Sequence, residues 1–104
     1  MATIRVYVYK DSGFIDSYKV YPPIVVLSGN DKFELVNTVD NHDAFLTVPR
    51  DPFQGGPINN EKVVPKGRSG LKTPKNALAA VEYEVKVDGK KASGNSDPVI
   101  IIDP

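Results

Sequence analysis

The sequence predicts an all-β fold, an antiparallel Greek-key β-sandwich of seven or eight strands. Apolar residues recur at every second position in several short runs, which is the period of a strand with one buried face. Most of these runs are too short to form a helix. Nine prolines and eight glycines separate the runs and favour turns. A chain of 104 residues is expected to fold as one domain, residues 1–104, and Greek-key connections are usual in such sandwiches.

The first expected strand shows the alternation clearly. In residues 3–9, Ile4, Val6 and Val8 fall on one face and are expected in the core. A turn at residues 11–13 predicts that this strand forms a hairpin with the strand that follows it.

The stretch from residue 24 to residue 49 is expected to supply three further strands, separated by a tight turn and a short polar loop. Its middle strand, residues 32–37, alternates between polar and apolar side chains. Phe33 and Leu35 are therefore expected in the core, and Glu34 is expected on the opposite face.

A long loop is expected at about residues 49–80, because glycine and proline interrupt every apolar pattern there. Structureless loops of this length are uncommon in compact domains and are often functional. Residues 81–87 alternate and predict a strand, and Asp88 and Gly89 predict a hairpin turn after it. The apolar run 99–102 predicts a central strand that is covered on both faces.

The charge balance limits the classes of partner. Thirteen basic and thirteen acidic residues cancel, so no overall field attracts nucleic acid or an anionic membrane. The sequence therefore gives no strong nucleic-acid signal.

The chain has no cysteine, which excludes disulfides, thiolate nucleophiles and cysteine-based metal sites. It has no membrane-spanning segment, because no apolar run approaches the roughly 20 residues that a membrane helix needs. No signal peptide precedes the first strand, so a cytoplasmic location is expected if the N-terminus is native.

His42 is the only histidine, and it lies between Asp40 and Asp43. An imidazole beside carboxylates can bind a divalent metal ion or serve an enzyme, so a metal-binding or enzymatic role of these three residues is one alternative. A histidine in a polar loop is more often a solvated side chain, and the spacing is not that of a calcium-binding loop.

Tyrosines gather in the first two expected strands, at Tyr7, Tyr9, Tyr18 and Tyr21. Such a stripe is usually cross-strand packing on a solvent face. The alternative is a stacking platform that binds carbohydrate or a nucleic-acid base.

The long loop carries basic residues, among them Lys66 and Arg68, around a Lys-Gly-Arg-Ser-Gly sequence. The spacing of a phosphate-binding loop is absent, so solvated side chains are the simpler interpretation. Together with Tyr7 and Tyr9, Lys66 and Arg68 are the candidate binding residues.

The order of elements resembles the cupredoxin fold. The resemblance rests on the strand with Phe33, Leu35 and Asn37, on the loop that carries His42, and on the two strands expected near the C-terminus. It implies a copper site, but type 1 copper needs two histidines and a cysteine thiolate, and this chain has one histidine and no cysteine. Electron transfer is therefore not expected to carry over, and an immunoglobulin-like sandwich is the alternative fold.

These observations favour a non-enzymatic, cupredoxin-like binding or structural module. No catalytic residues and no cofactor are expected. The expected partner is an unknown protein or a polymer, and the sequence does not indicate an oligomeric state.

Overall fold

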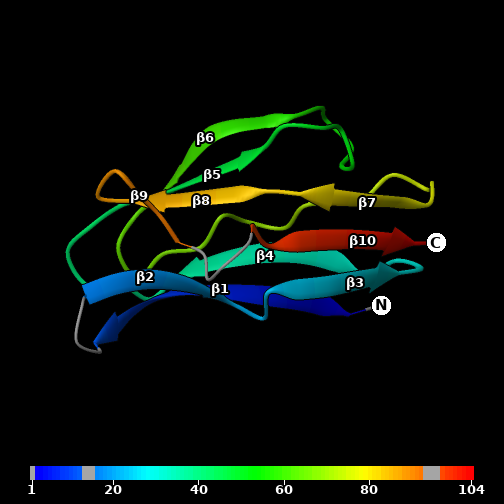
Figure 1. Cartoon of the computed structure of the whole chain (residues 1–104). Helices are drawn as coiled ribbons and strands as arrows, with labels where there is room; N and C mark the ends of the chain where they lie inside the picture. The colour runs from blue at the N-terminus through cyan, green and yellow to red at the C-terminus, as the bar shows by residue number, and fades with distance from the viewer. Residues whose placement is uncertain (1, 13–15, 93–96) are drawn as a thin grey trace.

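The computed structural model describes residues 2–12, 16–92 and 97–104, and these residues form ten strands and no helix (Figure 1). The strands are β1 (Thr3–Ser12), β2 (Asp16–Tyr21), β3 (Ile24–Ser28), β4 (Lys32–Asn37), β5 (Ala44–Val48), β6 (Ile58–Val63), β7 (Ala79–Glu82), β8 (Glu84–Val87), β9 (Lys90–Lys91) and β10 (Val99–Asp103). The all-β prediction is confirmed, and the several sheets are consistent with a β-sandwich.

The strands form three sheets, with the orders β2-β1-β4, β3-β10-β7 and β6-β5-β8-β9. Two neighbouring pairs are parallel, β1 with β4 and β3 with β10. The prediction of a purely antiparallel fold is therefore wrong. Alternation along a strand reveals which face is buried, but it contains no information about the direction of the neighbouring strand.

The expected loop at 49–80 is more ordered than predicted, because it contains β6 and a segment that runs along β4. In this edge segment, residues 66–75, Lys72 exchanges backbone hydrogen bonds with Phe33 at 3.0 and 2.7 Å. Asn37 N also donates to Gly67 O at 2.9 Å. The edge segment therefore covers the side of β4 that faces away from β1.

The strand predicted at 81–87 is divided at Tyr83 into β7 and β8, which belong to different sheets. The predicted turn after it is confirmed, because Asp88 and Gly89 have φ angles of 52° and 73°. In the turn predicted at 11–13, the first two residues belong to β1, and Gly13 lies outside the described residues.

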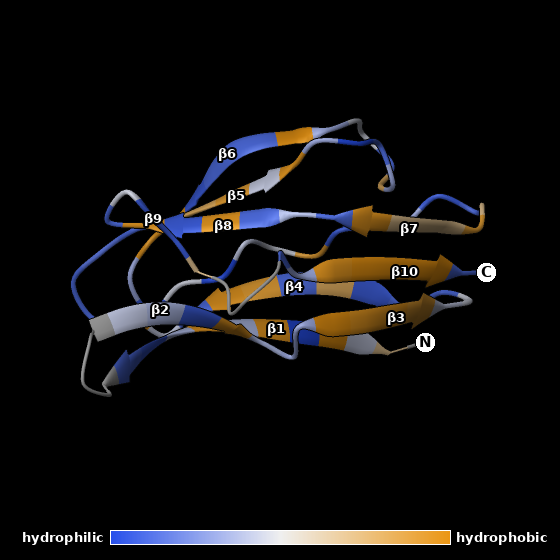
Figure 2. Ribbon diagram, in the orientation of Figure 1, coloured by the Kyte–Doolittle hydropathy of each residue, from blue (hydrophilic) through white to orange (hydrophobic). Residues whose placement is uncertain are grey.

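The predicted core residues Val6, Val8, Phe33 and Leu35 are buried, and Ile4 packs against them partly buried. Tyr83, Val85 and Ile100 are buried in the same core. The ring of Phe33 lies 5.5 Å from that of Phe53 and 5.8 Å from that of Tyr83. Figure 2 shows β3 and β10 as continuously hydrophobic strands. β10 is central in its sheet, as predicted, but its second face is only partly covered, because Val99 and Ile101 remain half-buried.

Candidate functional site

Three of the four tyrosines of the predicted stripe share the outer face of the sheet β2-β1-β4. In β1, Val6 and Val8 point into the core, so Tyr7 and Tyr9 point outward. Tyr7 pairs with Tyr21 across β1 and β2, and the side chains of such a pair lie on the same face. Tyr7 is 41% exposed and Tyr21 is 63% exposed. Both side chains therefore leave the same face from paired positions and are accessible to a ligand.

Tyr18 does not belong to this stripe. It is buried on the inner face, next to Val20 in the alternation of β2, and its ring meets the ring of His42 edge-on at 6.4 Å. Tyr18 and Tyr21 are three positions apart in β2, and residues an odd number of positions apart point to opposite faces of a strand. The predicted stripe therefore keeps only Tyr7, Tyr9 and Tyr21.

Arg5 and Arg68 lie beside the tyrosines and share one carboxylate. Arg5 Nε donates to Glu34 Oε1 at 3.2 Å, and Arg68 Nη1 donates to the same oxygen at 3.1 Å. Glu34 is only 7% exposed, although its side chain points toward the outer face. Glu34 lies on the face opposite Phe33 and Leu35, as predicted, and it is buried there because the edge segment and Arg5 cover it.

One line of neighbouring residues connects the two groups. Tyr21 pairs with Tyr7, Tyr7 pairs with Val36, and Val36 forms an isolated bridge with Arg68. Adjacent strands lie about 4.8 Å apart, so this line crosses the sheet within about 15 Å. We call Tyr7, Tyr9, Tyr21, Arg5 and Arg68 the tyrosine–arginine face. It contains three of the four candidate binding residues that the sequence indicated.

Lys66, the fourth candidate binding residue, is engaged elsewhere. Its Nζ lies 3.3 Å from Asp40 Oδ1, and both side chains are largely exposed. Lys66 has a φ angle of 59° and precedes Gly67, where an added Cβ would lie 2.9 Å from the backbone oxygen of Val64. This tight turn places Arg68 beside β4 and directs Lys66 toward Asp40.

The three candidate metal ligands do not form a cluster. Within the described ranges, no group of three or more His, Cys, Asp or Glu residues is arranged to hold a metal ion. Asp40 pairs with Lys66, and the half-buried ring of His42 packs against Tyr18. The arrangement does not favour a metal site that uses His42, Asp40 and Asp43.

Asn37 is a structural residue that the sequence reasoning missed. It is fully buried, and its Nδ2 donates to the backbone oxygens of His42 at 3.0 Å and Val63 at 3.1 Å. Its Oδ1 accepts a hydrogen bond from Val39 N at 2.9 Å. Its burial could have been predicted from its position, because Asn37 follows Phe33 and Leu35 at every second residue and so lies on the inward face of β4. An inward-pointing amide at the end of an apolar strand indicates a partner in the backbone.

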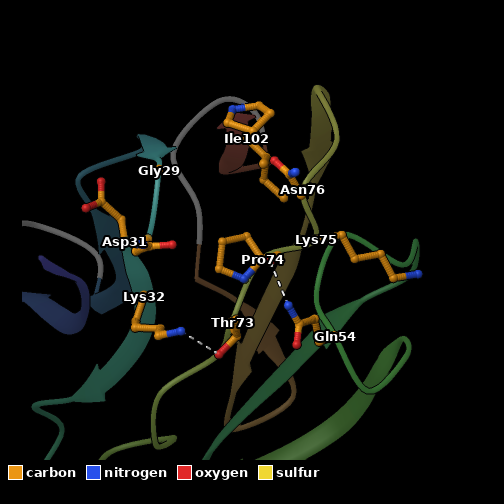
Figure 3. A pocket seen from close by; sticks show the side chains of 11 residues that line it. Gly29, Asp31, Lys32, Gln54, Thr73, Pro74, Lys75, Asn76 and Ile102 are labelled. Carbon is orange, nitrogen blue, oxygen red and sulfur yellow. Dashed lines mark hydrogen bonds between the residues drawn. The ribbon is translucent and has the colours of Figure 1, made fainter. Parts of the chain in front are cut away.

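The pockets are shallow and their polar groups are largely engaged. Figure 3 shows a pocket of about 300 Å³ in which Lys32 Nζ donates to Thr73 Oγ1 at 3.0 Å. A second pocket, of about 500 Å³, contains the ion pair between Lys72 and Glu61, whose atoms are 2.6 Å apart. Lys32 in the first pocket and Lys72 in the second are therefore each engaged by a neighbouring side chain.

A second exposed surface lies on the sheet β3-β10-β7. Ile24 is 58% exposed and Val26 is 47% exposed, and the half-buried Val99 and Ile101 lie beside them on β10. This surface is largely apolar, and the exposed Glu82 of β7 lies at its border, paired with Val99. No helix in the described part of the chain is long and apolar enough to cross a membrane.

The comparisons with known proteins do not assign the chain to a family. No protein-family model matches it, and no curated protein is significantly similar to it.

Proposed function

We propose that the protein is a non-enzymatic binding module that holds a polysaccharide on the tyrosine–arginine face. The observation that carries this proposal is the line of neighbours from Tyr21 through Tyr7 and Val36 to Arg68. It joins exposed aromatic rings to fixed hydrogen-bond donors on one outer face.

The chemistry of the face suits an extended sugar polymer. Tyrosine rings offer large contact areas at a low cost in conformational entropy, and their faces stack against the C–H groups of a pyranose ring. The pairing of β1 with β2 sets Tyr7 and Tyr21 opposite each other, so both can contact one extended ligand. Small ligands usually require concave pockets, whereas an extended polymer can lie across a flat sheet.

We also propose that the fold is cupredoxin-like without the copper ligands. The position of His42 in the loop after β4 supports this, as does the all-β architecture. An experimental structure whose connections do not form a Greek key would contradict it.

The proposed function is tested by affinity electrophoresis in gels that contain single polysaccharides, such as cellulose derivatives, xylan, pectins and alginate. We expect at least one polymer to retard the protein, and we expect Tyr21→Ala to weaken that binding by about fivefold or more, since aromatic stacking contributes about 1–3 kcal/mol per ring in comparable platforms. Leu78→Ala is the matched control, because Leu78 is 78% exposed and lies away from the face. The proposal fails if no polymer retards the protein, or if Tyr21→Ala binds as tightly as the control.

A further inference from the structure

We infer that the polysaccharide is acidic, and that Arg68, with Arg5 beside it, binds a sugar carboxylate while the sugar rings stack on Tyr7 and Tyr21. This inference rests on the proposed function and specifies its ligand class. The three observations behind it are the charge of the face, the availability of donors on the arginines, and the position of the acidic side chains.

The outer face of the sheet β2-β1-β4 carries an excess of positive charge. Among the described residues, the alternation and register place three cations there and two carboxylates, since the Lys32 ammonium is engaged by Thr73 in the neighbouring pocket. The cations are Arg5, Lys19 and Arg68, and the carboxylates are Asp11 and Glu34. An anionic ligand would complement this excess, although the whole chain is neutral.

The arginines retain donors for a ligand. Each guanidinium has five N–H groups, and Arg5 and Arg68 each use one nitrogen to contact Glu34 Oε1. The side chain of Arg68 is 55% exposed and that of Arg5 is 41% exposed. The buried Glu34 carboxylate fixes both guanidinium groups, so their remaining donors are positioned before a ligand arrives. A planar guanidinium matches a carboxylate in a bidentate pair.

The charges also set an orientation. Near Tyr9, Lys19 pairs with Asp11 at 3.0 Å, so that end of the face is electrostatically balanced. At the other end, Arg5 and Arg68 share a single carboxylate. A carboxylate of the ligand therefore belongs at the Arg68 end, with the adjoining sugar ring over Tyr7.

A sparsely charged polymer fits this face better than a nucleic acid does. Nucleic-acid binding depends on neutralising several closely spaced phosphates, usually in a strongly basic groove. Here the excess on the face is one charge, and the overall charge of the chain is zero. One carboxylate per sugar unit needs only the local donors of the two arginines.

The test compares three probes by isothermal titration calorimetry with the whole chain. Polygalacturonate carries the carboxylates, fully methyl-esterified polygalacturonate has the same backbone without charge, and a single-stranded (dT)20 oligonucleotide represents nucleic acid. We expect polygalacturonate to bind at least about tenfold more tightly than its ester, because only free carboxylates accept charge-assisted hydrogen bonds from the arginines. Raising the salt concentration should weaken the binding of the charged probes, polygalacturonate and (dT)20, and should leave the binding of the uncharged ester unchanged.

Two variants separate the role of Arg68 from a general effect of net charge. Arg68→Gln should remove most of the preference for polygalacturonate over its ester. Lys75→Gln changes the net charge equally, but Lys75 pairs with Asp51 away from the face, so it should keep that preference. Circular dichroism spectra and melting temperatures of both variants establish that they are folded.

The outcomes distinguish failure of the inference from failure of the proposed function. If both forms of the polymer bind equally, or if Arg68→Gln keeps the preference, the inference is wrong but polysaccharide binding stands. If (dT)20 binds more tightly than polygalacturonate, the ligand class is nucleic acid and the inference is wrong. If neither form of the polymer binds, the inference is wrong, and the wider polysaccharide panel decides whether the proposed function also fails.

Discussion

Arg5 and Arg68 donate to the same carboxylate oxygen, Glu34 Oε1, from the two neighbours of β4. β1 supplies Arg5 and the edge segment supplies Arg68, so one buried side chain links three segments that are distant in sequence. The candidate ligand donors and the packing of the sheet depend on the same interaction.

Replacement of Glu34 should therefore be costly. Glu34→Ala is expected to lower the free energy of unfolding by about 1–3 kcal/mol, which is less than for a fully buried ion pair because both arginines are partly solvated. Urea denaturation measures this change. Glu82→Ala, at an exposed position of β7, should cost less than about 0.5 kcal/mol. Equal losses in the two variants would show that the shared carboxylate has no structural role.

The stability of the protein should also depend on the amide of Asn37, even when the replacement has the same shape. Asn37→Asp places an acceptor against the backbone oxygens of His42 and Val63, and we expect a loss of about 2–4 kcal/mol at pH 7. Chemical denaturation gives the value, and the exposed Asn59→Asp serves as the control. If Asn37→Asp is as stable as that control, the buried amide does not hold the loop after β4.

Tyr83 gives a prediction for alkaline pH. Burial raises the pKa of its phenol, and Tyr83 Oη has no hydrogen-bond partner in the described part of the chain. Above about pH 10 the unfolded chain loses this proton while the folded chain retains it, so the stability should fall as the pH rises. Tyr83→Phe should match or exceed the wild-type stability at pH 7, by up to about 1 kcal/mol, because it removes an unsatisfied hydroxyl.

The measurement for Tyr83 is a set of urea midpoints between pH 7 and pH 11. The alkaline decline should be smaller in Tyr83→Phe than in the wild type, because the variant lacks the buried phenol whose pKa is raised. A marked loss of stability in Tyr83→Phe at pH 7 would mean that the hydroxyl is satisfied.

Copper provides the test of the metal alternative. With Cu(II) the protein should remain free of intense blue absorption, because thiolate-to-copper charge transfer requires a cysteine and the chain has none. Any bound copper should be weakly held and removed by a chelator. Submicromolar affinity that His42→Ala abolishes would establish a metal site instead.

The same His42 variant reports on packing. Because the ring of His42 meets that of Tyr18, His42→Ala should lower the free energy of unfolding by about 0.5–1.5 kcal/mol. Thermal and urea denaturation without metal measure this, and an unchanged stability would show that the ring contributes no packing.

The alternation of side chains predicts much of the fold and part of the face. It places Val6 and Val8 inside and Tyr7 and Tyr9 outside, as the structure has them. The same parity rule, applied to β2, would have separated Tyr18 from Tyr21. These successes and omissions all concern local geometry, which a strand fixes within a few residues.

The alternation of side chains could not predict which strands pair with one another. Nothing in the alternation indicates that β1 and β4 are parallel, or that the edge segment covers β4. The burial of Glu34 and its contact with Arg68 follow from that covering. Because glycines and prolines interrupt the edge segment, it lacks the regular period by which strands are recognised, although it forms backbone hydrogen bonds.

The parallel pairing of β3 with β10 has a consequence for the order of folding. β3 ends at Ser28 and β10 begins only at Val99, so their sheet cannot close until β10 has been synthesised. Until then Val25 and Leu27, which are buried in the final structure, have no sheet partner in β10. Pairings between distant segments slow folding and prolong the exposure of apolar strands. On the ribosome, the N-terminal hairpin can form early, while β3 must wait for the last strand.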